Sequence, residues 1–167
     1  MMDKRYGLIL IIFIVCIINL ISIVDVSDVV GSASAECGDF IFSLPEGFTL
    51  YDSNPNQVLI RNSDGIEIYV YSKIDRADTY DAKIKEIESK GYTIISNGTI
   101  DVGGINVKSV YYNKTDDDHQ NRSTFFFTKD NNRFRILVMD FNMANDKNKT
   151  IDYVSTIIDS LKVNYKK

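Results

Sequence analysis

Hydrophobic positions along this chain follow two patterns, a continuous apolar run near the start and a polar–apolar alternation after it. Residues 7–24 contain no charged side chain. As a helix rising about 1.5 Å per residue, they would span roughly 27 Å, close to the hydrocarbon core of a bilayer. Lys4 and Arg5 precede the run, and basic flanks stay on the cytoplasmic side. The pattern predicts a transmembrane helix over residues 7–24 that places the C-terminal domain outside the cell.

A cleaved secretory signal is the alternative interpretation of this apolar run. Signal peptides usually have about 7–15 apolar residues, followed closely by a small-x-small cleavage site. The run here is longer, and its best cleavage site, Ala-Ser-Ala at residues 33–35, lies well beyond it. We therefore predict that residues 1–24 form the signal anchor of a single-pass cell-membrane protein, with a removed signal peptide and a secreted protein as the alternative.

Strand-like segments occupy much of the remaining chain. Residues 25–38 are small and polar and are predicted to be a linker, which leaves residues 39–167 as one ectodomain. Asn-Ser-Asp-Gly at residues 62–65 predicts a hairpin turn between two strands. Alternating or apolar segments predict extended structure at residues 40–44, 48–51, 57–61, 66–72, 92–96, 99–102, 105–113, 124–129 and 133–141.

Two amphipathic helices are predicted between these strands. The first follows a cap at Asp78 or Thr79, and Gly91 ends it. The second covers residues 148–161 and carries a continuous apolar stripe. Residues 136–139 are apolar on both faces, which is typical of a central strand covered from both sides. The order of the elements favours an α+β fold, in which helices flank an antiparallel β-sheet.

Composition excludes several classes of function. Residues 36–167 contain 17 basic and 20 acidic side chains, a net charge of −3, which argues against a nucleic-acid partner. Cys37 is the one cysteine of residues 36–167, so no internal disulfide can form there and a free, inert thiol is predicted. One histidine and one distant cysteine cannot build a zinc site, and the chain has no glycine-rich phosphate-binding motif. We therefore predict no cofactor.

His119, the single histidine, is the residue most suited to chemistry. It follows Asp116, Asp117 and Asp118. A histidine base must be held by packing and a second hydrogen bond, and successive carboxylates of an extended chain point to opposite sides. A solvated acidic loop is therefore favoured, and no catalytic residue is predicted. A secreted enzyme or a weak cation-binding protein that uses Asp116–His119 is the alternative.

Four Asn-x-Ser/Thr triplets are candidate acceptors of N-linked glycans in a translocated domain. The acceptor residues are Asn97, Asn113, Asn121 and Asn148. Asn113 and Asn121 are the best placed, because both flank a polar loop. Chance is the alternative explanation, since the chain is rich in asparagine, serine and threonine.

Alternation places Tyr69 and Tyr71 on the same face of a strand. Two exposed rings would form a stacking surface for a glycan or a partner protein. Aromatic residues of strands mostly pack against other elements, so the favoured prediction is that a helix covers this face.

Four segments spread over residues 39–163 form a combination known from extracytoplasmic domains. They are the entry Phe-Ile-Phe-Ser-Leu-Pro-Glu-Gly-Phe at residues 40–48, the strand that ends near Ser72 before the helix at Thr79, the Gly103-Gly104 hairpin, and the final helix ending at residues 158–163. In this combination the chain resembles the PsbP-like fold family, which includes DcrB-like and LpqN-like proteins. The resemblance implies an α/β/α sandwich with accessory or binding roles. We therefore predict a membrane-anchored, extracytoplasmic, non-catalytic binding or assembly domain, whose partner is an unknown protein or glycan.

Overall fold

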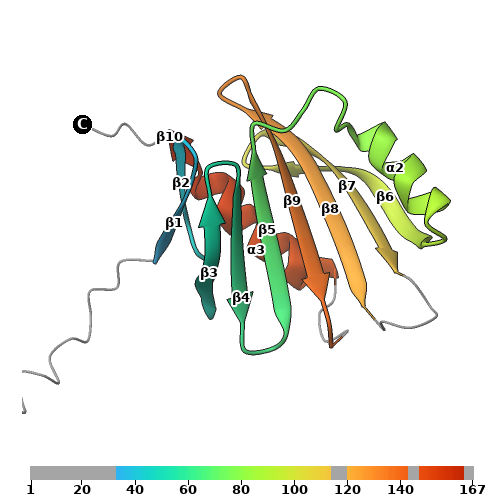
Figure 1. The fold of residues 1–167 in the computed structure, drawn as a ribbon, viewed down its shortest axis with the longest axis horizontal. Helices are drawn as coiled ribbons and strands as arrows, with labels where there is room; N and C mark the ends of the chain where they lie inside the picture. The colour runs from blue at the N-terminus through green and yellow to red at the C-terminus, as the bar shows by residue number, and fades with distance from the viewer. Residues whose placement is uncertain (1–32, 114–119, 143–146, 164–167) are drawn as a thin grey trace, which may run out of the picture. The chain divides into compact units, whose positions relative to one another are not determined.

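A seven-stranded antiparallel sheet is the largest element of the computed structural model, which describes residues 33–113, 120–142 and 147–163 (Figure 1). Its strand order is β3-β4-β5-β9-β8-β7-β6. The strands are β3 (Phe48–Asn54), β4 (Gln57–Asn62), β5 (Ile66–Ser72), β6 (Thr93–Val102), β7 (Ile105–Asn113), β8 (Asn121–Lys129) and β9 (Asn132–Asp140). A smaller sheet contains β1 (Ser34–Cys37), β2 (Phe40–Ser43) and β10 (Lys162–Val163), and the helices are α2 (Tyr80–Ser89) and α3 (Lys147–Ser160). The α+β fold class is thus confirmed.

The predicted hairpin at residues 62–65 joins β4 to β5. The Asn62 side-chain oxygen accepts hydrogen bonds from the backbone N–H groups of Asp64 and Ile66, at 3.1 and 2.9 Å. Gly65 has a φ of 81°, a conformation that glycine adopts without steric cost. This turn fixes the register, so that Ile60 lies opposite Ile68 on one face of the sheet.

One face of the seven-stranded sheet, here called the inner face, is covered by α3 and by the β1–β2 hairpin. Val154, Ile157 and Ile158 of α3 are completely buried against it. The Phe40 ring of β2 contacts the Phe134 ring of β9 edge to face, with centroids 4.8 Å apart. Figure 1 shows α3 behind the sheet, so the core lies between this helix and the strands.

The opposite face, the outer face, is covered at one end. Ile87 of α2 packs in a small cluster with Val110 and Tyr112 of β7. The helix begins as predicted, because the Thr79 hydroxyl accepts a hydrogen bond from the Ala82 N–H at 3.1 Å. In Figure 1, α2 lies beside β6 and β7, at the end of the sheet away from β3.

The central strand β9 is confirmed as central but is not covered equally on both sides. Ile136 and Val138, on the inner face, are 0% and 2% exposed. Leu137 and Met139, on the outer face, are only half-buried. The expectation of complete burial on both faces is therefore wrong, since α2 docks on β6 and β7 rather than over β9.

The strands differ from the predicted ones mainly in two places. β1 occupies Ser34–Cys37 of the predicted linker, because pairing with β2 places Ala35 and Cys37 in the core. The two segments predicted at 92–96 and 99–102 are one strand, β6, with a bulge between Ile94 and Ser96. The false division falls at Asn97 and Gly98, residue types typical of turns, which here continue the strand and pair with Val110 and Ser109.

Two sequence predictions lie outside the described residues. They are the transmembrane helix over residues 7–24 and the acidic loop with Asp116–His119. Neither helix in the described part of the chain has the length and apolarity needed to cross a bilayer.

Candidate functional site

The uncovered part of the outer face carries a band of aromatic and apolar side chains. We call it the aromatic strip and define it as Leu59 of β4, Tyr69 and Tyr71 of β5, and Arg135 and Leu137 of β9. Leu59 is buried, and the other four are half-buried. The strand register aligns Leu59, Tyr69 and Leu137 across three neighbouring strands. Tyr71 lies opposite Arg135 in the same way. The strip therefore follows from the period-two alternation of strands that sit side by side.

The two tyrosines form a stacked pair with nearly parallel rings. Their ring centroids lie 6.3 Å apart, and the ring planes differ by 13°. Both residues are half-buried rather than exposed or fully covered. The favoured prediction that a helix covers Tyr69 and Tyr71 is thus wrong among the described residues, because α2 packs over β7 through Ile87.

Hydrogen bonds and an ion pair hold Tyr69 from one side. Its hydroxyl donates to a Glu67 carboxylate oxygen at 2.7 Å, and the other oxygen of Glu67 lies 2.6 Å from the Arg61 guanidinium. The Arg61 guanidinium also lies 3.5 Å from the centroid of the Tyr51 ring. Burial and the Glu67 hydrogen bond raise the pKa of Tyr69 from 10.0 to about 12, so its hydroxyl remains a donor at neutral pH.

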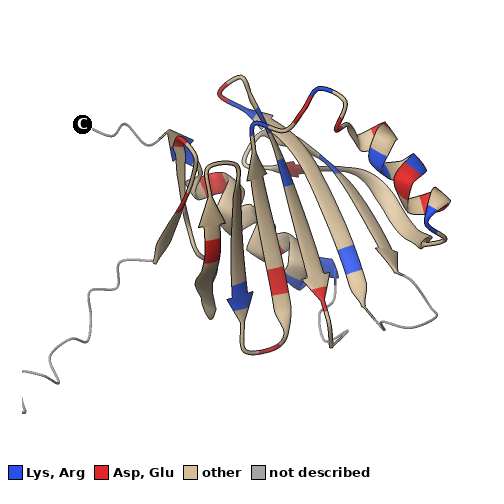
Figure 2. Ribbon diagram, in the orientation of Figure 1, with Lys and Arg blue, Asp and Glu red and all other residues tan. Residues whose placement is uncertain are grey.

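A second ion pair holds the other end of the strip. Arg135 pairs with Asp78, which lies in the loop between β5 and α2. The same guanidinium lies 4.2 Å from the centroid of the Tyr71 ring, within the range of a cation–π interaction. Burial raises the pKa of Tyr71 above its ordinary value. Figure 2 shows isolated charged positions on β4, β5 and β9, in contrast to the dense mixture on α2.

The predicted glycan acceptors lie on strands and a helix rather than on separate loops. Asn97 is exposed on β6, and Asn148 is exposed in the first turn of α3. Asn113 and Asn121 pair with each other at the ends of β7 and β8. Their use as acceptors stays a prediction.

Cys37 and the acidic side chains of the described residues define what chemistry this part of the chain offers. Cys37 is a free cysteine, fully buried, and its thiol donates to the Val70 carbonyl at 3.5 Å. Burial raises the pKa of this thiol, which keeps it protonated at neutral pH. Across residues 33–113, 120–142 and 147–163, no group of three or more His, Cys, Asp and Glu side chains is placed to hold a metal ion.

Solved structures with a similar fold include cyanobacterial PsbP (CyanoP) from Synechocystis sp. PCC 6803. It is 16% identical with a TM-score of 0.48, and the match covers 81% of this chain and 96% of that one. LpqN of Mycobacterium tuberculosis, described as involved in cell envelope biogenesis, is 11% identical with a TM-score of 0.49 over 83% of this chain and 87% of its own. The immunity protein TplEi of Pseudomonas aeruginosa is 14% identical with a TM-score of 0.42, over 83% and 52%.

The resemblance to PsbP-like and LpqN-like domains is thus confirmed at the level of the fold. No protein-family model and no curated protein matches the sequence.

Proposed function

We propose that this chain is a membrane-anchored, extracytoplasmic and non-catalytic module that binds a partner protein on the aromatic strip. One observation carries the proposal. The half-buried, nearly parallel rings of Tyr69 and Tyr71 lie on a sheet face that α2 leaves uncovered, and Arg135 stacks against one of them.

The composition of the strip suits a protein partner. Tyrosine, arginine and methionine are enriched in the cores of protein interfaces, and Met139 extends the strip along β9. Glu67 forms an ion pair with Arg61, and Asp78 forms one with Arg135. The surface therefore has little net charge of its own. A partner would therefore present apolar and hydrogen-bonding groups rather than a strong opposite charge.

Preorganisation of the rings supports tight binding. Glu67 and Arg135 hold Tyr69 and Tyr71 before any partner arrives, so less side-chain freedom is lost on association. Each immobilised side chain otherwise costs about 0.5–1.5 kcal/mol of binding free energy. Strand β5, which carries both rings, is hydrogen-bonded to β4 on one side and to β9 on the other, and this pairing makes it rigid.

The predicted transmembrane helix over residues 7–24 supports the location. Its basic flank at Lys4 and Arg5 favours a cytoplasmic N-terminus, which places residues 39–167 outside. Protease added to intact cells should then digest the C-terminal region. Survival of that region until the cells are lysed would contradict the location but not the binding surface.

Photo-crosslinking in the native cell tests the binding surface. A benzoylphenylalanine at Tyr69 should yield one discrete adduct, whereas the same group at Thr99, exposed on the outer face of β6, should yield none. With the partner purified, Tyr71→Ala should weaken binding about 30-fold, as expected for a central aromatic residue. Equal adducts at both positions, or an adduct removed by glycosidases, would overturn the proposed protein partner.

A further inference from the structure

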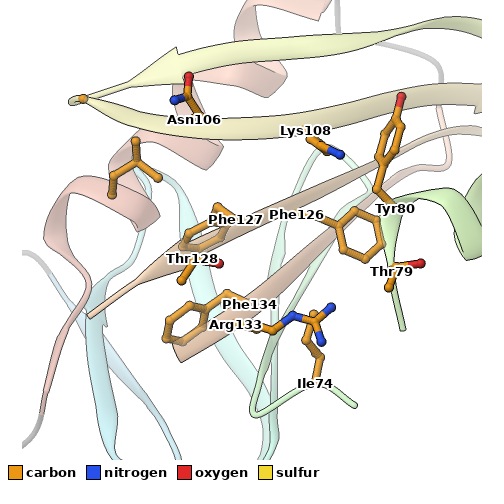
Figure 3. A pocket seen from close by; sticks show the side chains of 12 residues that line it. Ile74, Thr79, Tyr80, Asn106, Lys108, Phe126, Phe127, Thr128, Arg133 and Phe134 are labelled. Carbon is orange, nitrogen blue, oxygen red and sulfur yellow. The ribbon is translucent and has the colours of Figure 1, made fainter. Parts of the chain in front are cut away.

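A cavity of about 530 Å³ opens on the outer face beside the start of α2, apart from the aromatic strip (Figure 3). Its volume lies within the range of about 300–1,000 Å³ found for small-molecule sites. The residues around it come from the loop before α2, from α2 itself, from the turn between β6 and β7, and from β7, β8 and β9. Those central to the site are Ile74, Tyr80, Lys108, Phe126 and Arg133.

The Phe126 and Tyr80 rings give the cavity an apolar floor. Phe126 is 7% exposed on the outer face, whereas the Phe127 and Phe134 rings belong to the core on the inner face. The Tyr80 ring meets the Phe126 ring edge to face at 6.2 Å, and Figure 3 shows these two rings side by side. Ile74 adds an aliphatic group from the loop before α2. An apolar body placed here would lose contact with water on burial.

Positive charge without acidic residues marks the rim. Lys108 and Arg133 line the cavity, and none of its lining residues is an aspartate or glutamate. Lys108 is exposed and lies 5.4 Å from the centroid of the Tyr80 ring; it forms no ion pair with any described residue.

Arg133, the other cation of the rim, donates hydrogen bonds to neutral acceptors. Its guanidinium donates to the backbone carbonyls of Asp75 and Asp78, at 3.1 and 3.0 Å, and these are neutral acceptors. The nearby Asp78 carboxylate pairs with Arg135. Arg133 is therefore held in position by groups that leave its charge available to a bound anion.

We infer that this cavity binds a small amphipathic carboxylate, with its apolar body on Phe126 and its acidic head between Lys108 and Arg133. The strand register supports this arrangement, because Lys108 pairs with Phe126 and Arg133 pairs with Thr128, so the two cations flank β8. Strands lie about 4.8 Å apart, which places the two backbones roughly 10 Å from each other. Long side chains from both sides can reach a head group above β8.

Two probes that share one body test the charge requirement. Phenylbutyrate and phenylbutylamine are titrated into the full chain, in phosphatidylcholine nanodiscs, and binding is followed by calorimetry. The acid should bind at least about tenfold more tightly than the amine, the scale of one charge-assisted hydrogen bond. Equal binding of the acid and the amine, or no binding of either, would overturn the inference.

Variants locate the site. Lys108→Gln should weaken phenylbutyrate binding about tenfold, because Lys108 is exposed and its loss leaves the fold intact. Lys85→Gln removes the same charge from an exposed position of α2 outside the cavity and should change nothing. Ile74→Asp adds a carboxylate to the wall and should abolish binding while thermal unfolding stays cooperative.

Identical affinities for Lys108→Gln and Lys85→Gln would show that the acid binds elsewhere. Tyr71→Ala, on the aromatic strip, should leave phenylbutyrate binding unchanged. The cavity and the proposed protein partner are therefore tested separately.

Discussion

The two faces of one strand, β5, differ in how deeply their side chains are buried. Its inner side chains, Ile66, Ile68 and Val70, are each 0% exposed. Its outer side chains, including Tyr69 and Tyr71, stay half-buried. Because the backbone is shared, the difference in burial comes from what covers each face. Cover rather than strand propensity therefore decides whether a residue of β5 joins the core or stays partly exposed.

The covers themselves differ in size and composition. The 14 residues of α3 bring Val154, Ile157 and Ile158 to the inner face, together with the β1–β2 hairpin. The 10 residues of α2 bury one residue fully, Ile87, and carry a mixture of charges (Figure 2). A short, charged helix cannot cover seven strands, so part of the outer face remains available.

The largest expected effect separates neighbouring residues of β9. Ile136→Ala should lower the free energy of unfolding by about 2–5 kcal/mol, since Ile136 is completely buried on the inner face. Leu137→Ala, on the half-buried outer face, should cost only about 1 kcal/mol. Urea unfolding followed by circular dichroism measures both. Similar losses for the two variants would contradict the assigned asymmetry between the faces.

A smaller effect tests the hairpin that covers the inner face. Gly38, in the β1–β2 turn, has a φ of 63°, and a Cβ there would lie 2.5 Å from the Pro55 carbonyl oxygen. Gly38→Ala should therefore lower the free energy of unfolding by more than the about 1–2 kcal/mol expected for a left-handed alanine alone.

Gly47→Ala is the matched control for this hairpin. Gly47 has a φ of 80° but no atom within 4 Å of its added Cβ, so only the conformational cost applies. Thermal unfolding of the two variants gives the difference. A Gly47→Ala loss as large as that of Gly38→Ala would show that the β1–β2 turn is not pressed against Pro55.

The smallest effect concerns the outer cover. Hydrogen bonds from Lys90 and then Lys83 lower the pKa of Glu86 on α2 below 4.5. The ionised carboxylate therefore contributes stability that is present above pH 4.5 and is lost as the pH falls through the lower folded-state pKa. Glu86→Gln should cost less than about 1 kcal/mol at pH 7, because the pair is solvent-exposed.

Urea unfolding of Glu86→Gln at pH 7 and below pH 4 measures this contribution. The difference from the unchanged chain should shrink at the lower pH. A constant difference at both pH values would assign the effect to helix propensity instead of charge.

Local patterns predicted much of the fold. The Asn62–Gly65 turn and the Thr79 cap depend on groups within a few residues of each other, and both occur as expected. Strand β5 occupies Ile66–Ser72, the range that alternation indicates. The short strands β1 and β10 were not recognisable, because their stability comes from pairing with β2 rather than from their own residues.

Neither the uncovered strip nor the cavity could be located in the same way. Alternation paired Tyr69 with Tyr71, but the docking position of α2 decided that they remain accessible. The register of β7, β8 and β9 brings Lys108, Phe126 and Arg133 around one cavity, although no motif joins them in the sequence.

Interactions between near neighbours in the chain depend only on local residue types. The strands, the helix caps and the order of the elements could therefore be predicted from the sequence. The exposure of a sheet face cannot be predicted in this way. It depends on which distant segment buries more apolar area by packing on that face. Helix α3 packs on the inner face. Helix α2 covers only part of the outer face, so the aromatic strip and the cavity lie beside it. That competition between segments is resolved when the chain folds as a whole.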